Sequence, residues 1–251
     1  MLLHCCQNFR NSGFVLLQTL WLLLLASLLT TAVMATSLSN ARDGASAAAV
    51  FQVEMAAESA IHVVLYDMLT TGRRSVWLQG VAAPAITMGG AEVTVSVGDA
   101  QGLVDLNAAD EAILRRFLAA ALPARDAVTL TNAIKAARPI GDYSTLRALE
   151  GMSPEAFESV FPYVTLYSRQ SLPSAESASG WLAQVLRLEK SGHGVLSDTN
   201  AITGSVFRIE ATARSDVATS RKLTVDVLIT GRLDQPVWFY DWGWHLAAAN
   251  R

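Results

Sequence analysis

A long apolar run near the N-terminus constrains the fold of this chain more than any other feature. The run from Phe14 to Met34 reads FVLLQTLWLLLLASLLTTAVM, and no charged residue stands between Arg10 and Arg42. A helix rises about 1.5 Å per residue, so this run covers roughly 30 Å, the thickness of a bilayer hydrocarbon core. The sequence therefore predicts one membrane-spanning helix, with Arg10 placing the N-terminus in the cytoplasm.

Three interpretations of this run compete: a cleaved secretory signal, an uncleaved anchor, and a pilin-type leader that is cut before the apolar helix. A secretory signal has an apolar stretch of about 7–15 residues before a small-residue site. Val33-Met34-Ala35 offers such a site, but the run is longer than that. Cys5 is not in a lipoprotein context, because His4 precedes it where a small residue is expected.

The boundary Ser12-Gly13-Phe14 joins a polar leader to the apolar run. It resembles the type IV prepilin processing site, at which a membrane peptidase cuts after the glycine and methylates the new terminus. The resemblance implies a leader over residues 1–13, cleavage at Gly13 and methylation of Phe14. It also makes Gln18 the fifth mature residue, where most pilins carry a glutamate that neutralises a neighbouring amino terminus. Gln18 cannot neutralise that charge, so either it suits a filament tip or it is a tolerated polar residue in a generic anchor.

The apolar helix is expected to continue beyond the membrane as an amphipathic stem. Residues 45–69 contain no proline or glycine, and Val50, Ile61, Leu65 and Met68 recur at helical spacing. We therefore predict one transmembrane and stem helix over residues 14–71. His62 is interpreted as a surface residue of this stem, because only Glu58 stands near it as a second ligand type.

The remainder of the chain has the composition of an ordinary folded domain. Formal net charge is −3, and the only cysteines are Cys5 and Cys6, so no disulfide can form beyond the apolar run. Four segments alternate apolar and polar residues or are rich in aromatic residues, which is typical of strands. They cover residues 91–97, 206–213, 222–229 and 236–246. An antiparallel sheet is expected from them, with the aromatic cluster of the last segment contributing to a core or an interface.

Short helices are predicted to interrupt this sheet. The first covers residues 108–121 with Asn107 as its N-cap, and the second covers residues 126–137. A third follows Asp142, and a fourth follows the capping pair Ser153-Pro154. Helices of this length are not stable alone in water, so all four must share one core.

This helical block carries the most specific resemblance. The residues Asp105, Leu106, Asn107, Ala108 and Ala109 open it, Gly151-Met152 precedes its last helix, and residues 162–167 read PYVTLY. Together they resemble the K-type minor pseudopilins of type II secretion systems.

The resemblance implies an α+β, pilin-like fold, in which a long N-terminal transmembrane and stem helix packs on an antiparallel sheet with an all-α insertion. The pilin-like domain would occupy residues 72–104 and 166–251, and the insertion residues 105–165. The implied role is that of a non-enzymatic subunit at or near the tip of a periplasmic pseudopilus, in support of protein export.

The implied partners are the I-type and J-type minor pseudopilins, the prepilin peptidase, the inner-membrane assembly platform and the lipid bilayer. The chain would be a single-pass protein of the bacterial inner membrane with a periplasmic C-terminal domain. Calcium binding occurs in the family, but KAARPIGD between Ile134 and Tyr143 offers only Asp142, so no cofactor and no metal site are predicted.

Nucleic-acid binding and catalysis are disfavoured. Residues 105–165 contain six Lys/Arg and eight Asp/Glu, and their turns lack the Gly-x-Gly nest that holds DNA phosphates. The histidines His62, His193 and His245 stand in no recognisable catalytic context, and His193 falls in a Gly/Ser-rich segment that reads as a loop. Two alternatives stay open: a minor pilin or adhesin-like subunit of a type IV pilus, and an exported ligand-binding module with an ordinary anchor.

Overall fold

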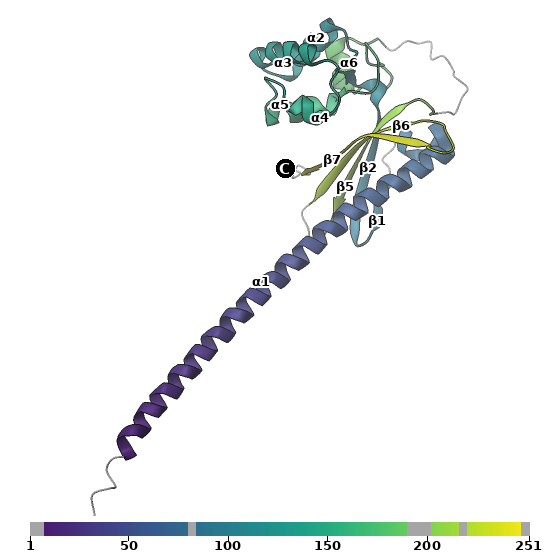
Figure 1. Ribbon diagram of the computed structural model, residues 1–251. Coiled ribbons are helices and arrows are strands. Elements are labelled where there is room, and N and C mark those ends of the chain that lie inside the picture. The colour runs from purple at the N-terminus through teal and green to yellow at the C-terminus, as the bar shows by residue number, and fades with distance from the viewer. Residues whose placement is uncertain (1–7, 80–83, 190–201, 216–219, 247–251) are drawn as a thin grey trace, which may run out of the picture. The chain divides into compact units, whose positions relative to one another are not determined.

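The computed structural model describes residues 8–79, 84–189, 202–215 and 220–246 (Figure 1). The chain divides into two units within its first helix, with the boundary after Phe51. Cys5, Cys6 and His193 lie outside the described residues, as does most of the segment 191–204 around His193, which is predicted to be a loop.

Helix α1 covers Asn8–Thr71, a continuous run of 64 residues. In the first unit its large apolar side chains, from Phe14 to Leu38, are exposed. Hydroxyl groups in this stretch bond to the helix itself: Thr30 Oγ1 donates to the Ala26 carbonyl and Thr31 Oγ1 to the Ser27 carbonyl, both at 2.8 Å. Among the described residues α1 is the one helix long and apolar enough to cross a bilayer, which is consistent with a single-pass anchor.

The second unit contains a five-stranded sheet in which every neighbouring pair is antiparallel. Its order is β1-β2-β5-β6-β7, with bounds β1 Ile86–Met88, β2 Ala91–Asp99, β5 Val206–Arg214, β6 Arg221–Ile229 and β7 Val237–Leu246. The four strands expected from the sequence are confirmed as β2, β5, β6 and β7. The short edge strand β1 was not anticipated. The expected fold class, α+β with a pilin-like arrangement, is confirmed.

The stem part of α1 packs on one face of this sheet. Small side chains let the two backbones approach closely, because Ala56, Ala57 and Ala60 are all buried at this contact. The sheet contributes alternate residues of β5 and β6 to this contact, as the period of two along a strand requires. The stem-side core comprises Val53, Ile61, Val64, Leu65 and Met68 from α1 and Phe207, Ile209, Ala211, Leu223, Val225 and Val227 from the sheet.

The helical part of the second unit, which we call the helical module, has a separate core. Its helices are α2 Glu111–Ala121, α3 Ala124–Ala137, α4 Tyr143–Arg147, α5 Pro154–Val160 and α6 Gly180–Leu186, with a 3-10 turn η4 at Phe161–Tyr163. The two-residue strands β3 Val104–Asp105 and β4 Val164–Thr165 pair in parallel at its base. Phe117, Leu130, Ile134 and Leu146 are fully buried in this core, as is Leu182 of α6. The expectation that the short helices share one core is therefore confirmed.

Helix starts agree with the sequence in two cases and differ in one. Ser153 and Asp142 cap α5 and α4 through their side chains, as expected. The predicted N-cap Asn107 is wrong, because α2 begins at Glu111 and Asp110 occupies the cap position. The difference has a physical reason: the Asn107 side chain forms hydrogen bonds to other loops instead.

Candidate functional site

The N-terminal processing residues lie within helix α1. The helix begins at Asn8 and so already includes Gly13 and Phe14, without a break at the predicted boundary. The side chains of Phe14 and Gln18 are exposed. Cleavage after Gly13, methylation of Phe14 and an assembly role for Gln18 therefore stay predictions.

The signature residue Asp105 is a buried carboxylate that joins two loops. Its Oδ1 atom accepts hydrogen bonds from the backbone N–H groups of Asn107 and Ala108, at 2.8 and 3.1 Å. Its Oδ2 atom accepts from the Arg169 backbone N–H at 2.6 Å and from the Ser168 hydroxyl at 3.2 Å. Asp105 is 1% exposed, and four donors satisfy it. It thus fastens the chain before α2 to the chain after β4.

Asn107 joins a third segment to the same place. Its Oδ1 atom accepts from the Ile140 backbone N–H at 2.7 Å, while its Nδ2 donates to the carbonyls of Ile140 and Leu166. Arg138 supports the same loop through Nε, which donates to the Leu106 carbonyl at 2.6 Å. Leu106 itself is fully buried in the helical core. The signature therefore closes the base of the helical module.

The second part of the signature shapes a turn. Gly151 has a φ of +86°, which favours glycine, and a Cβ added there would come within 3.3 Å of Thr129 Cγ2 on α3. Met152 is buried in the helical core. Gly151 lets the turn before α5 lie close to α3, so the role of the pair that is visible in the structure is architectural.

A buried charged cluster connects the helical module to the sheet, and the sequence analysis missed it. Arg208 of β5 and Asp226 of β6 are register partners on the sheet face opposite the stem. The Arg208 Nε and Nη2 atoms donate to the two Asp226 oxygens at 2.8 and 2.9 Å. From the helical module, the Tyr143 hydroxyl donates to Asp226 Oδ2 at 2.7 Å, and the Phe161 carbonyl accepts from Arg208 Nη1 at 2.8 Å.

Burial shifts the pKa of two side chains in and near this cluster, Tyr143 and Asp241. Burial and the neighbouring Asp226 carboxylate raise the pKa of the Tyr143 hydroxyl well above its ordinary value, so it stays protonated and donates. Burial, and again Asp226, raise the pKa of the Asp241 carboxyl on β7. The signal in the sequence was an arginine and an aspartate, each inside an apolar strand, at positions that face the same side.

The aromatic cluster of β7 divides between core and surface. Trp244 packs against the stem-side core, whereas Trp238 is 50% exposed and Phe239 and Trp242 are each 37% exposed. Tyr240 stacks on Tyr167 beyond β4, with ring centroids 4.5 Å apart. Trp244 thus contributes to a core, as the sequence suggested, and a role of the exposed rings in an interface stays a prediction.

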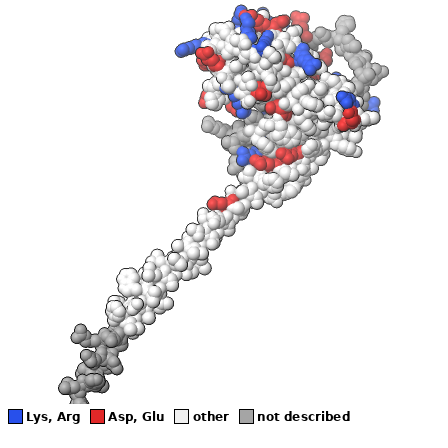
Figure 2. All heavy atoms as spheres, viewed as in Figure 1, with Lys and Arg blue, Asp and Glu red and all other residues white. Residues whose placement is uncertain are grey.

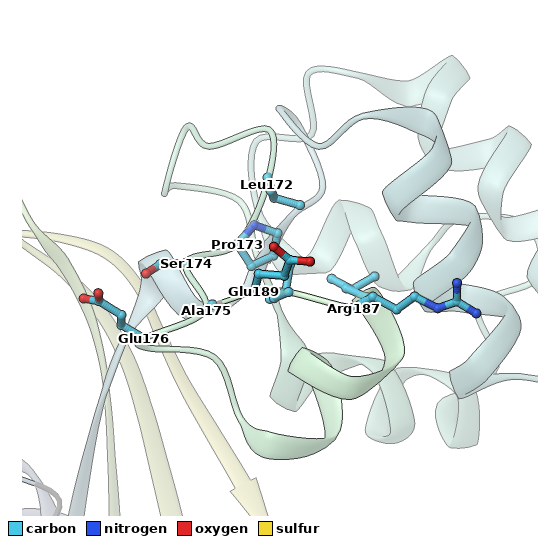
Figure 3. A pocket seen from close by; sticks show the side chains of 9 residues that line it. Leu172, Pro173, Ser174, Ala175, Glu176, Arg187 and Glu189 are labelled. Carbon is cyan, nitrogen blue, oxygen red and sulfur yellow. The ribbon is translucent and has the colours of Figure 1, made fainter. Parts of the chain in front are cut away.

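The pocket shown in Figure 3 does not have the side-chain arrangement of a catalytic site. The pocket of Figure 3 has a volume of about 320 Å³ and lies between the chain after β4 and the end of α6, with Leu172, Pro173, Glu176, Arg187 and Glu189 along it. Its charged side chains do not converge on a common point in this view. Nothing in this arrangement assembles a nucleophile with a base.

The described part of the chain contains neither a cluster of metal ligands nor, on the face shown in Figure 2, an extended basic surface for phosphate. There, no group of three or more His, Cys, Asp or Glu side chains is placed to hold a metal ion. Asp142 accepts hydrogen bonds from the Ser144 hydroxyl and the Thr145 backbone N–H, as a helix cap does. On the face shown in Figure 2, acidic and basic side chains are interspersed over the helical module. Such a surface has no extended positive field for a phosphate backbone.

The fold defines the chain as pilin-like: a long N-terminal helix packed on an antiparallel sheet that carries a helical insertion. Among solved structures, the chain is similar to a chain in the crystal structure of the GspK-GspI-GspJ complex from the type 2 secretion system of enterotoxigenic Escherichia coli. The TM-score is 0.56 at 13% sequence identity, and the match covers 79% of this chain and 97% of that chain. No protein-family model matches the sequence, and no curated protein matches it.

Proposed function

We propose that this chain is the K-type minor pseudopilin of a type II secretion system, positioned at or near the tip of the periplasmic pseudopilus. The observation that carries the proposal is the helical module, with its own core, inserted into a pilin-like sheet. The similarity to a chain of the GspK-GspI-GspJ complex, over 97% of that chain, supports the same assignment. The function is structural, and the chain is not an enzyme.

The helical module suits a tip subunit because it enlarges the domain and is attached to the sheet by buried hydrogen bonds. Arg208, Asp226 and Tyr143 attach it to the sheet, and Asp105 and Asn107 close its base. A rigid enlargement of this kind would block further subunits from adding above it, or would contact the secretion channel or its cargo. Its partners would be the I-type and J-type minor pseudopilins.

The N-terminal part of the proposal concerns insertion and processing. The chain would cross the bacterial inner membrane once through α1, with its N-terminus cytoplasmic and its second unit periplasmic. The prepilin peptidase would remove residues 1–13 and methylate Phe14, and the assembly platform would then extract the subunit. Gln18 suits the terminal position, because no earlier subunit would present an amine that needs neutralising.

The test is a deletion strain of the source bacterium, complemented with the full chain. We expect deletion to abolish secretion of type II substrates and the wild-type chain to restore it. Mass spectrometry of the restored protein should find methylated Phe14 at its terminus. The variant Gly13→Val should retain its leader and fail to restore secretion, whereas the matched leader variant Asn11→Ala should be processed and active.

Three results would contradict the proposal. Unchanged secretion in the deletion strain would reject the type II role, and loss of surface pili instead would favour a type IV minor pilin. A mature terminus other than methylated Phe14 would reject prepilin processing. Full activity after exchange of α1 residues 14–48 for an unrelated membrane helix would favour an exported binding module with an ordinary anchor.

A further inference from the structure

One face of the stem in the second unit is exposed although most of its residues are apolar or aromatic. Met55, Glu58, His62, Tyr66 and Leu69 follow one another at intervals of three or four residues, so they form a continuous row on α1. We call this row the stem stripe. Met55 is 44%, Tyr66 72% and Leu69 39% exposed, on the side of α1 away from the residues that pack on the sheet.

Two aromatic rings of β7 widen the stem stripe. Phe239 and Trp242 pair in register with Val227 and Val225, whose side chains are buried on the stem side of the sheet. The His62 ring lies 6.5 Å from the ring of Phe239 and 6.4 Å from that of Trp242, centroid to centroid. β7 ends the order of the described sheet, so no further described strand lies beyond these rings.

A single carboxylate interrupts this apolar surface. Glu58 is half-buried and has no hydrogen bond or ion pair within the described parts of the chain. One turn earlier, Glu54 faces Arg221, whose Nε lies 3.6 Å from its carboxylate. Covering the stripe would remove Glu58 from water, which is unfavourable unless the covering partner supplies a positive charge. Glu58 therefore specifies part of the partner's chemistry.

The spacing and length of the stem stripe fit a helix. Its ends, Met55 and Leu69, are 14 positions apart, which corresponds to about 21 Å of helix. Apolar residues at intervals of three and four form the ridges that pack between the ridges of another helix. A partner helix with its own apolar row would match this surface along its whole length.

A second copy of this chain in equivalent register does not satisfy that requirement. Between Asp43 and Gly72 α1 has no Lys or Arg, and it carries Glu54, Glu58 and Asp67. Two such stems in that register would bring their Glu58 carboxylates together with no Lys or Arg of the stem to compensate them, and like charges brought together in an interface are repulsive. The charge requirement of Glu58 therefore favours a different chain over a second copy in equivalent register.

We propose that the stem stripe, with Phe239 and Trp242, is the docking face for the stem helix of a different pilin-like subunit that places a Lys or Arg opposite Glu58. The inference rests on the proposed function and deepens it, because it identifies the surface and the chemistry of the partner. The apolar row supplies contact area, and the ion pair with Glu58 sets the register and the choice of partner.

Photocrosslinking in the source bacterium tests the docking face in the full chain. Benzoyl-phenylalanine replaces Tyr66 in the stem stripe or, as a matched control, the exposed Val128 of α3. We expect an adduct from position 66, mapped by mass spectrometry to the stem of another pilin-like subunit within one helical turn of a Lys or Arg. The adduct should be absent from position 128.

Charge reversal tests the role of Glu58. Glu58→Lys should lower the yield of the position-66 adduct by about tenfold or more, since it opposes two positive charges. Glu92→Lys, which reverses an exposed acid on β2, should leave the yield unchanged. Reversal of the mapped basic residue to Glu should restore the adduct in the Glu58→Lys strain, and restoration also shows that this variant folds.

The outcomes separate this inference from the proposed function. An adduct only with lipid, with a second copy of this chain, or with a stem segment that lacks a basic residue would overturn the docking inference. So would the absence of any adduct from position 66, or an unchanged yield in Glu58→Lys. In each of these cases the secretion phenotype and the terminus at Phe14 still report on the proposed function independently.

Discussion

The variant Arg208→Met gives a quantitative test of how the helical module is attached to the sheet. Methionine keeps much of the length of the side chain and removes the guanidinium. The change deletes both hydrogen bonds to Asp226, the bond to the Phe161 carbonyl and the bond that Arg208 Nη2 donates to the Tyr143 hydroxyl. It leaves the Asp226 carboxylate, which is 1% exposed, with the Tyr143 hydroxyl as its remaining side-chain donor in the cluster.

The expected cost follows from that burial. Removing one partner of a buried ion pair destabilises a protein by about 3–5 kcal/mol, because the remaining charge is left without compensation. For a domain of this size each kcal/mol lowers Tm by about 2–4 °C, so we expect a decrease on the order of 10 °C. Replacing both partners, as in Arg208→Met with Asp226→Leu, should recover most of the loss, since it leaves no buried charge.

The assay is thermal unfolding of the full chain in detergent, followed by near-UV circular dichroism. Arg232→Met is the matched control, because Arg232 also pairs with a carboxylate, Asp234, but both side chains are 67% exposed. An exposed pair contributes at most about 1 kcal/mol, so the control should unfold within about 4 °C of the wild type. If Arg208→Met shifted Tm no more than Arg232→Met, the proposed attachment would be wrong.

Three further variants test other parts of the structure. Asp105→Ala removes an acceptor of four hydrogen bonds and should cost about 2–4 kcal/mol in urea unfolding, whereas Asp126→Ala on the exposed side of α3 should cost less than about 0.5. Gly102→Ala should lower the free energy of unfolding by about 1–3 kcal/mol, because the added Cβ would overlap the backbone at Ser177. Gly98→Ala is the control, because its Cβ would lie 4.0 Å from the Arg208 carbonyl oxygen and would overlap nothing. Asp241→Asn should be more stable than wild type at pH 7, because the raised pKa of Asp241 means that the folded state disfavours its ionised form. The difference in stability should disappear below about pH 3.8, where the carboxyl is protonated in the folded and the unfolded chain. An equal or larger gain in stability at that pH would contradict the assignment.

The sheet and the short helices could be predicted because their signals are local. Alternation in β2, β5 and β6 reports directly which residues face the stem, and Ser153-Pro154 starts a helix wherever it stands. The residues that resemble the K-type family also pointed to a helical module within a sheet. These inferences needed no knowledge of which segments meet in space.

The error at Asn107 and the missed cluster at Arg208 have a common cause. Asn107 is a good cap by type, but its side chain contacts Ile140 and Leu166, which lie 33 and 59 positions further along the chain. Arg208 and Asp226 become neighbours only once the register of β5 and β6 is known, and Tyr143 joins them from 65 positions before Arg208. The hydrogen bonds of such polar side chains depend on partners far away in the chain, and a single sequence does not reveal those partners.

The parallel pair of β3 and β4 has a consequence for how this architecture can vary. Val104 and Val164 are register partners, so the chain enters and leaves the segment between β3 and β4 at adjacent strands, which lie about 4.8 Å apart. The distance that the rest of the domain must bridge is therefore independent of how many residues the intervening loop of helices contains. Helices of very different total length could therefore be inserted between β3 and β4 while this strand pair keeps its register, through changes confined to one contiguous stretch of a gene.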